Sequence, residues 1–296
     1  MLIQTIHENH VSFLLLLGVC CELFIIFSVL HKWEHSYFSK IIHHKKPMIL
    51  LGEIVINIIH LIFLILMTLP GGEISKRELH FIWIVDCSGS MRDDGKIQAL
   101  NYAIKEAIPH MQRESENNIQ ANLLISALKF STGAQWIIPP TRVNEFKWTD
   151  IEAKGETDLG QAFLLLSEIL HIPPMTERGL PPVLVLLSDG QPTDNFKDGL
   201  DKLLSEPWGR KAIRVSIAIG EDANTDILQR FIGDGERQPL LARNPESLTK
   251  YIKWVSTVVQ SASARPKSQQ KYYDGSISNV DIPKPPEMIS GATDVW

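Results

Sequence analysis

The sequence predicts an α/β fold in which a doubly wound, mostly parallel sheet follows a transmembrane helical hairpin. Two observations support this prediction. Helix-like and strand-like segments alternate between residues 79 and 260, as expected when helices cover both faces of a parallel sheet. The first 72 residues contain two long apolar stretches. The total of 296 residues leaves room for one domain and additional segments.

Two membrane-spanning helices are predicted, at about residues 11–30 and 48–69. Each stretch contains a single charged residue, Glu22 in the first and Glu53 in the second. With a rise of about 1.5 Å per residue, about 20 helical residues cross a hydrocarbon core of about 30 Å. A cleaved signal peptide is the alternative for the first stretch, but no basic residue precedes it. Residues 1–72 are therefore interpreted as a membrane anchor.

The loop between the two predicted spans is basic, with Lys32, Lys40, Lys45 and Lys46 against one acid, Glu34. Basic loops favour the cytoplasmic face of a membrane. We therefore expect a multi-pass protein of the cell inner membrane whose globular domain lies on the extracytoplasmic side. This expectation rests on loop charge alone, and a cytoplasmic domain stays open as the alternative.

Polar residues within the predicted spans form a second pattern. Glu53, Asn57 and His60 follow one another at intervals of four and three residues, which places them on one helix face. Glu22 in the first span would lie at a depth similar to that of Asn57. Such residues are costly in lipid and usually face protein or water. Two interpretations remain open: packing within the hairpin or between subunits, and a proton or ion path.

The globular part is predicted from residue 79 to residue 260. The apolar run at 79–85 indicates a first strand, and apolar residues spaced by three and four indicate a helix over 95–117. A hairpin of strands 119–130 and 134–138 follows, and then a helix over 159–171 capped by Thr157 or Asp158. The uninterrupted apolar run at 183–187 is typical of a strand buried on both faces.

The remaining segments complete the alternation of helices and strands. We expect, in order, a helix, a strand, a helix, a strand and a helix at 196–205, 213–219, 226–231, 239–242 and 245–259. From 261 to 296 the chain contains Ser, Gln, Lys and Pro without periodicity. This tail is predicted to be disordered alone or docked on a partner. Its apolar anchors are Tyr272, Tyr273, Ile277, Ile282, Met288 and Trp296.

Oxygen-bearing side chains follow the predicted strands at three places. Asp86, Ser88 and Ser90 come after the first strand, Thr157 precedes a helix, and Asp189 comes after the strand at 183–187. In an open α/β sheet the carboxyl ends of the strands meet at one crevice, where ligands bind. Mg²⁺ prefers such oxygen ligands, and Mn²⁺ and Ca²⁺ accept them too. A divalent-cation site is therefore predicted there.

This ordered set, Asp-x-Ser-x-Ser with a distant Thr and a distant Asp, resembles the metal-ion-dependent adhesion site of von Willebrand factor type A (vWA) domains. The resemblance implies that Ser88, Ser90 and Thr157 offer hydroxyls to the ion, whereas Asp86 and Asp189 hold it mostly through waters. It also implies an open position that a partner's Asp or Glu fills. The stretches 95–101, 154–160 and 187–194 look similar to the bacterial subgroup that includes tellurium-resistance-associated proteins.

Catalysis is not expected. Ser88 and Ser90 would need a neighbouring base to act as nucleophiles, and no His lies in the strand-end clusters. His80 and His110 are expected to be ordinary surface or edge residues. Cys87 is expected to point into the core. The net charge is −5, and the sequence shows no basic patch. Nucleic acid is therefore not an expected partner.

Two classes of function follow. The first is a membrane-anchored, non-enzymatic module that binds a partner's carboxylate through the cation and so assembles a protein complex. Such a complex would act in stress response or phage defence. Besides that partner, we expect contact with lipid and with further membrane subunits or a second copy of the chain. The alternative is a subunit of an ion-conducting or energy-transducing assembly with the globular domain as coupling element. A third option resembles membrane-anchored bacterial vWA proteins linked to aerotolerance, although this chain has no apolar stretch suited to a C-terminal span.

Overall fold

A computed structural model describes residues 76–118, 121–235, 237–259, 261 and 282–286, together with His60. The chain divides into two units, 1–72 and 73–296. Within the second unit, six described strands form one sheet in the order β3-β2-β1-β4-β5-β6. Every pairing is parallel except that of β2 with β3, which confirms the predicted mostly parallel sheet. The strands are β1 Arg77–Asp86, β2 Ala121–Ser131, β3 Gly133–Arg142, β4 Val183–Ser188, β5 Ile213–Ile219 and β6 Leu240–Ala242.

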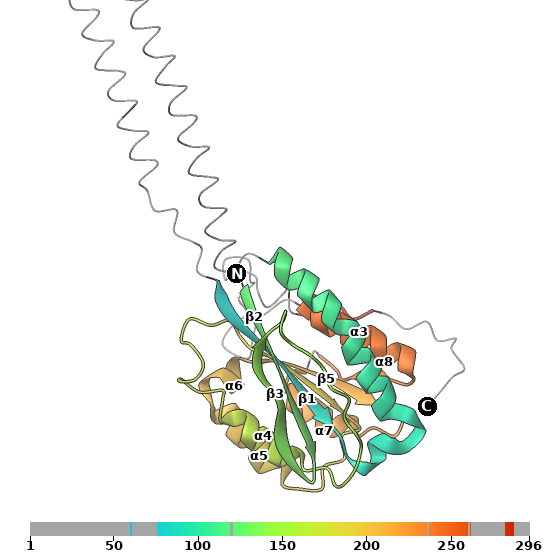
Figure 1. Cartoon of the computed structure of the whole chain (residues 1–296). Helices are drawn as coiled ribbons and strands as arrows, with labels where there is room; N and C mark the ends of the chain where they lie inside the picture. Colours follow the sequence, from blue (N-terminus) through green and yellow to red (C-terminus); the bar gives the residue numbers. More distant parts are fainter. Residues whose placement is uncertain are drawn as a thin grey trace, which may run out of the picture. The chain divides into compact units, whose positions relative to one another are not determined.

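Helices cover both faces of this sheet (Figure 1). Helices α3 and α8 pack together on one face, and α4 and α5 pack together on the other. The described helices are η1 Gly89–Gly95, α3 Lys96–Asn117, α4 Leu159–Ser167, α5 Phe196–Ser205, α6 Pro207–Lys211, α7 Thr225–Ile232, α8 Pro245–Trp254 and η2 Val255–Val259. Here η1 is a 3₁₀ helix, and η2 continues α8 as a π-helix.

The sheet separates two apolar cores. Along β1, Phe81 and Trp83 belong to the core beneath α3 and α8, whereas Ile82 and Ile84 belong to the core beneath α4 and α5. All six residues of β4 are buried. This explains why β1 and β4 read as continuous apolar runs, since a strand covered on both faces has no side that favours polar residues.

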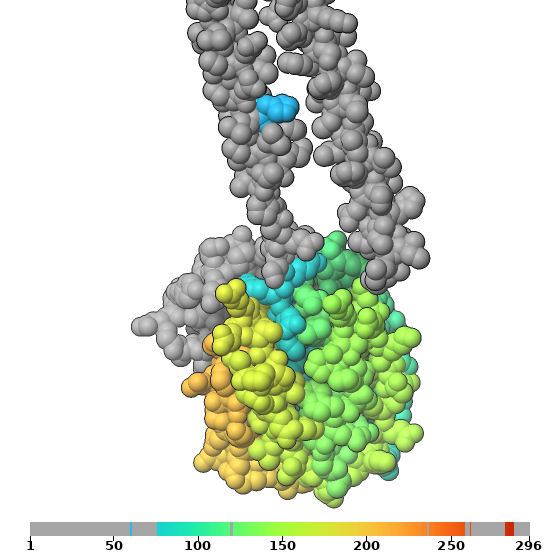
Figure 2. Space-filling view, turned by 60° about the vertical axis from the view of Figure 1, so that its left-hand side comes forward, coloured from blue at the N-terminus to red at the C-terminus, as the bar shows by residue number. Residues whose placement is uncertain are grey.

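Strand β3 lies at one end of the described sheet order and is only partly buried. Figure 2 shows its hairpin, in green, beside the yellow segment that contains α4, and β3 contacts α4. Pro139 and Pro140 lie within β3. Prolines at a sheet edge hinder pairing with another chain because they offer no N–H group.

Two local features differ from the sequence prediction. Helix α4 ends at Ser167 instead of His171, and α6, which begins with Pro207, was not expected. Asp158 occupies the N-cap position of α4, but its side chain makes no capping bond. Asp194 instead accepts hydrogen bonds from the amides of Gly160 and Gln161, at 2.9 and 2.8 Å. The expected cap is therefore replaced by a carboxylate from another loop.

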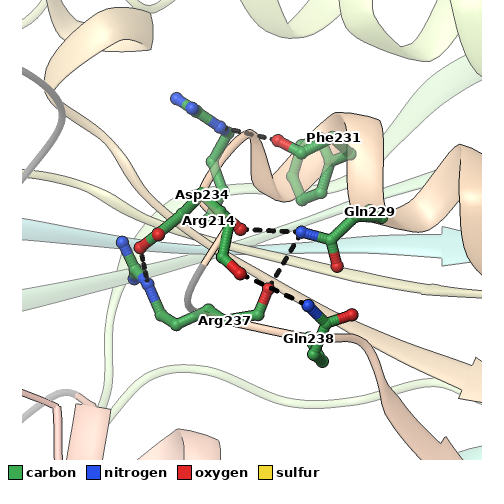
Figure 3. Close-up of polar contacts among 7 residues, drawn as sticks. Arg214, Gln229, Phe231, Asp234, Arg237 and Gln238 are labelled. Atoms are coloured by element: carbon green, nitrogen blue, oxygen red, sulfur yellow. Dashed lines mark hydrogen bonds and ion pairs between the residues drawn. The ribbon is translucent and has the colours of Figure 1, made fainter.

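Near the amino end of β5, buried Arg214 joins the ends of two helices (Figure 3). Its Nε donates to the carbonyl of Phe231 at 2.7 Å, and its Nη1 donates to that of Gly209 at 3.1 Å. Burial, together with the charge of Arg237, lowers its pKa to about 10, and Asp234 opposes this change. The side chain remains a cation at neutral pH, which suits carbonyls at helix carboxyl ends.

The predicted spans 11–30 and 48–69 lie outside the described residues, except for His60, which is helical and exposed. Glu22, Glu53 and Asn57 also lie outside them. Among the residues that the structure describes, no helix combines the length and apolar character needed to cross a bilayer. Of the predicted tail anchors, Ile282 is described, and it packs against the core beneath α3 and α8.

Candidate metal centre

Asp86 and Ser188 end the adjacent parallel strands β1 and β4. The Asp86 carboxylate is fully buried. Its Oδ1 accepts a hydrogen bond from the Ser88 amide at 2.8 Å, and its Oδ2 accepts one from the Ser188 hydroxyl at 2.6 Å. The amide of Gly190 in turn donates to the Ser188 hydroxyl at 2.8 Å. Asp86 is therefore held from both strands in one orientation.

The hydroxyls of Ser88 and Ser90 lie 3.0 Å apart. Ser88 precedes the 3₁₀ helix η1 as its N-cap but makes no side-chain capping bond. Ser88 is buried, whereas Ser90 is partly exposed. The two hydroxyl oxygens therefore lie close enough together to contact one ion.

The segment that carries Thr157 is attached to the β1 loop through its backbone. The amide of Gly89 donates to the carbonyl of Gly155 at 2.9 Å, and that of Lys154 donates to the carbonyl of Cys87 at 2.7 Å. Gly155 has a φ of +84°, and a Cβ there would lie 2.5 Å from the Thr132 hydroxyl oxygen. The close approach of this segment to Thr132, together with the positive φ, therefore requires a glycine.

Thr157 itself is buried and is held by Thr193, a residue from the loop after β4. The amide of Thr157 donates to the Thr193 hydroxyl at 3.0 Å, and the amide of Thr193 donates to the carbonyl of Thr157 at 2.9 Å. These bonds bring together the loops of Ser88, Thr157 and Asp189, as the sequence predicts for one sheet edge.

Asp189 is nearly fully buried, and its Oδ1 has no hydrogen-bond partner among the described residues. Burial, followed by the negative charge of Asp189, raises the pKa of Asp86 to about 6. Two neighbouring buried carboxylates are unfavourable without a compensating charge. A cation beside them would offset both the repulsion and the missing partner of Asp189.

The donor set indicates which cations fit. In the described part of the chain, no group of three or more His, Cys, Asp or Glu is placed to hold a metal, so a zinc-like site has no support there. Two carboxylates and three hydroxyls offer oxygen only, which suits Mg²⁺, Ca²⁺ or Mn²⁺. The residues present therefore fit a hard divalent cation.

Two residues with positioning roles were not predicted as site residues. Ser188 orients Asp86, and Thr193 orients Thr157. Ser188 is adjacent to Asp189, and Thr193 lies in the same loop. The residues that they orient are distant from them in sequence. The histidines also need a correction, because His80 is buried instead of lying at the surface. His80 is six residues before Asp86 on β1, about 20 Å away at about 3.3 Å per residue.

Residues 81–191 match the model of the von Willebrand factor type A domain family. The domain therefore has a Rossmann-like vWA fold with a mostly parallel sheet. Domains of this type are generally non-enzymatic interaction modules. No curated protein sequence matches the chain.

Solved structures resemble the chain at low identity. The pilus adhesin SpaC of Lactobacillus rhamnosus GG is 12% identical, with 62% of this chain and 30% of that chain covered and a TM-score of 0.50. The ArnB paralog VWA2 of Sulfolobus acidocaldarius is 21% identical, with coverages of 60% and 45% and a TM-score of 0.45. A von Willebrand factor type A protein of Catenulispora acidiphila is 18% identical, with coverages of 62% and 42% and a TM-score of 0.46. The match spans less than half the length of each of these proteins.

Proposed function

We propose that this chain is a membrane-anchored interaction module that binds a partner's carboxylate through a divalent cation, most simply Mg²⁺. Asp86, Ser88, Ser90, Thr157 and Asp189 would hold the ion. The observation that carries the proposal is the buried pair Asp86 and Asp189, in which one Asp189 oxygen has no partner among the described residues. The bound ion would supply an electrophilic position that a partner's Asp or Glu fills.

The chain's own residues would keep this site rigid before the partner arrives. Ser188 and the Ser88 amide fix the Asp86 carboxylate, and Thr193 fixes the Thr157 segment. Because these bonds cross between loops, partner binding would require little ordering of the site. A preorganised site loses less entropy on binding.

Hydroxyl ligands favour reversible capture over hydrolysis. They carry no charge, so they leave the ion more electrophilic toward an incoming carboxylate than a shell of acidic ligands would. For acyl transfer, a base would have to lie beside Ser88 or Ser90. His80, six residues before Asp86 on β1, is too distant for that role.

The experiment is a titration of Mg²⁺ into the full-length chain in nanodiscs, followed by calorimetry. We expect saturable binding to the wild type and none to Asp86→Asn or Asp189→Asn. The matched control is Asp201→Asn, which neutralises an exposed carboxylate on α5. Equal heats from the wild type and both site variants would contradict the metal assignment.

A second experiment recovers partners from detergent extracts with and without EDTA. Partners that are lost in EDTA belong to complexes that depend on the ion.

For the remainder of the chain, we propose that residues 11–30 and 48–69 anchor the module in the inner membrane with its domain extracytoplasmic. A complex-assembling role in stress response or phage defence would suit a tethered domain of this kind. The support is the apolar length of the two stretches and the basic loop between them. A fluorescent reporter that matures only in the cytoplasm, fused after Trp296, should stay dark. A bright reporter would place the domain in the cytoplasm.

The second candidate is a subunit of an ion-conducting or energy-transducing assembly, favoured by the polar series Glu53, Asn57 and His60 and by Glu22. Leucine at Glu22 or Asn57 distinguishes the two functions. Loss of assembly alone would indicate packing within the membrane. Loss of ion flux in a correctly assembled complex would support the second candidate.

A further inference from the structure

The loops around the candidate metal centre carry more acids than bases. Exposed carboxylates occur in the loops after β1 and β5 and in the segment before α4. These residues, which we call the acidic rim, are Asp93, Asp94, Glu156, Glu221 and Asp222. The exposed basic residues in the same segments are Arg92, Lys147 and Lys154. The surface that a partner would approach therefore carries an excess of negative charge.

Hydrogen bonds between loops place this rim around one site. The amide of Asn224 donates to the carbonyl of Asp189 at 2.6 Å, so the β5 loop touches the metal loop of β4. The side-chain amide of Gln191 donates to the carbonyl of Asp222 at 3.2 Å. The bond between Gly89 and Gly155 joins the loops of Asp93 and Glu156.

Neighbouring bases compensate only part of this charge. Asp222 is paired with Lys96 at 3.1 Å, yet its side chain remains 62% exposed. Among the described residues, Asp93, Asp94, Glu156 and Glu221 form no ion pair. The loop of Asp189, whose buried Oδ1 lacks a hydrogen-bond partner among the described residues, is bonded to the rim loop that carries Asp222.

We propose that the partner presents its metal-binding Asp or Glu between Lys or Arg residues, which pair with the acidic rim. This proposal rests on the proposed function and specifies its partner. A divalent cation is balanced by Asp86 and Asp189, so the rim keeps its own negative charge when the ion is bound. A carboxylate without basic neighbours would be repelled on approach. Long basic side chains reach outward from the metal and remove this repulsion.

The test uses the full-length chain in nanodiscs and three short labelled peptides. One has a central Asp between lysines, the second has the Asp between serines, and the third has Asn between lysines. With saturating Mg²⁺ and low salt, we expect the first to bind at least about tenfold more tightly than the second. Binding of the third should be weak, and EDTA should not change it. Raising the salt concentration should reduce the preference, because the Debye length is about 10 Å at 0.1 M.

The rim variant combines Asp93→Asn, Glu156→Gln and Glu221→Gln. It should bind Mg²⁺ and the serine-flanked peptide as the wild type does, with the lysine preference reduced to near unity. The matched control is Glu116→Gln, Glu177→Gln and Asp201→Asn, which neutralises exposed acids elsewhere and should keep the preference.

The possible failures are distinguishable. Equal Mg²⁺-dependent binding of both Asp peptides would overturn the rim proposal and leave the proposed function standing. Loss of bound Mg²⁺ from the rim variant would also overturn it, because the acids would then be cation ligands. If Mg²⁺ changes the binding of neither Asp peptide, the proposed function itself fails.

Discussion

The hydroxyl of Ser188 donates to Asp86 Oδ2 at 2.6 Å, across the boundary between β4 and β1. The two residues are 102 positions apart in the sequence. Because Ser188 also accepts from the amide of Gly190, one side chain links the loop of Asp189 to the carboxylate of Asp86. The two acidic residues of the candidate centre are thereby held in a fixed relationship.

Replacing Ser188 by Ala should weaken Mg²⁺ binding and lower the free energy of unfolding. Asp86 Oδ2 would lose its partner in a buried site, at a cost of about 1 to 3 kcal/mol. Urea unfolding in EDTA and calorimetric Mg²⁺ titration measure the two effects separately. Ser205→Ala removes an exposed hydroxyl bonded within α5 and should leave both unchanged. A Ser188→Ala protein with normal Mg²⁺ affinity would contradict the positioning role.

Asp189→Asn should lower the melting temperature relative to the wild type only when the ion is present. In EDTA, the substitution removes a charge that faces Asp86, so the melting temperature should stay equal to that of the wild type or rise. In Mg²⁺, the wild type should gain stability, by about 2.7 kcal/mol when the ion is at 100 times its dissociation constant. The variant should show no such gain. Thermal unfolding in both buffers measures this, and a gain equal to that of the wild type would exclude Asp189 as a ligand.

His80 should make stability fall as the pH decreases. Burial lowers its pKa, and the nearby Glu78 carboxylate only partly opposes this. The unfolded chain therefore binds more protons than the fold below the ordinary histidine value of about 6.5. The stability that comes from a neutral His80 is present above that pH and is lost below it.

The measurement for His80 is denaturant unfolding at several pH values between about 5 and 7.5. His80→Gln should show a shallower fall in unfolding free energy at acid pH than the wild type. His171→Gln, at an exposed position, serves as the control with an unchanged slope. An identical slope in His80→Gln would show that His80 does not contribute.

Replacing Arg214 by Met should destabilise the domain without changing Mg²⁺ affinity. The substitution keeps an apolar stem but removes bonds to the carbonyls of Phe231 and Gly209. Hydrogen bonds to charged groups contribute about 1.5 to 3 kcal/mol each, so a loss of at least about 2 kcal/mol is expected. Arg210→Met, on an exposed residue of α6, is the control. Wild-type stability in Arg214→Met would show that the carbonyls are satisfied without this side chain.

The sequence alone determined the alternation of elements and the loops that carry the oxygen ligands. Strand β5 has the predicted bounds Ile213–Ile219, because apolar residues recur at every second position from Ile213 to Ile219, as in a strand with a buried face. The pattern Asp86, Ser88 and Ser90 is also local, since these side chains lie within one loop. Patterns of this kind reflect the periodicity of side chains along a single element.

Only the tertiary structure decided which groups satisfy one another. Asp158 stands where a cap of α4 is expected, yet it accepts from the Gly133 amide at 2.7 Å, and Asp194 takes its capping role. Ser188 and Thr193 likewise act on residues from other loops. Hydrogen-bond partners separated by many residues leave no periodic trace in a sequence, because their proximity depends on strand order and on how closely the loops approach.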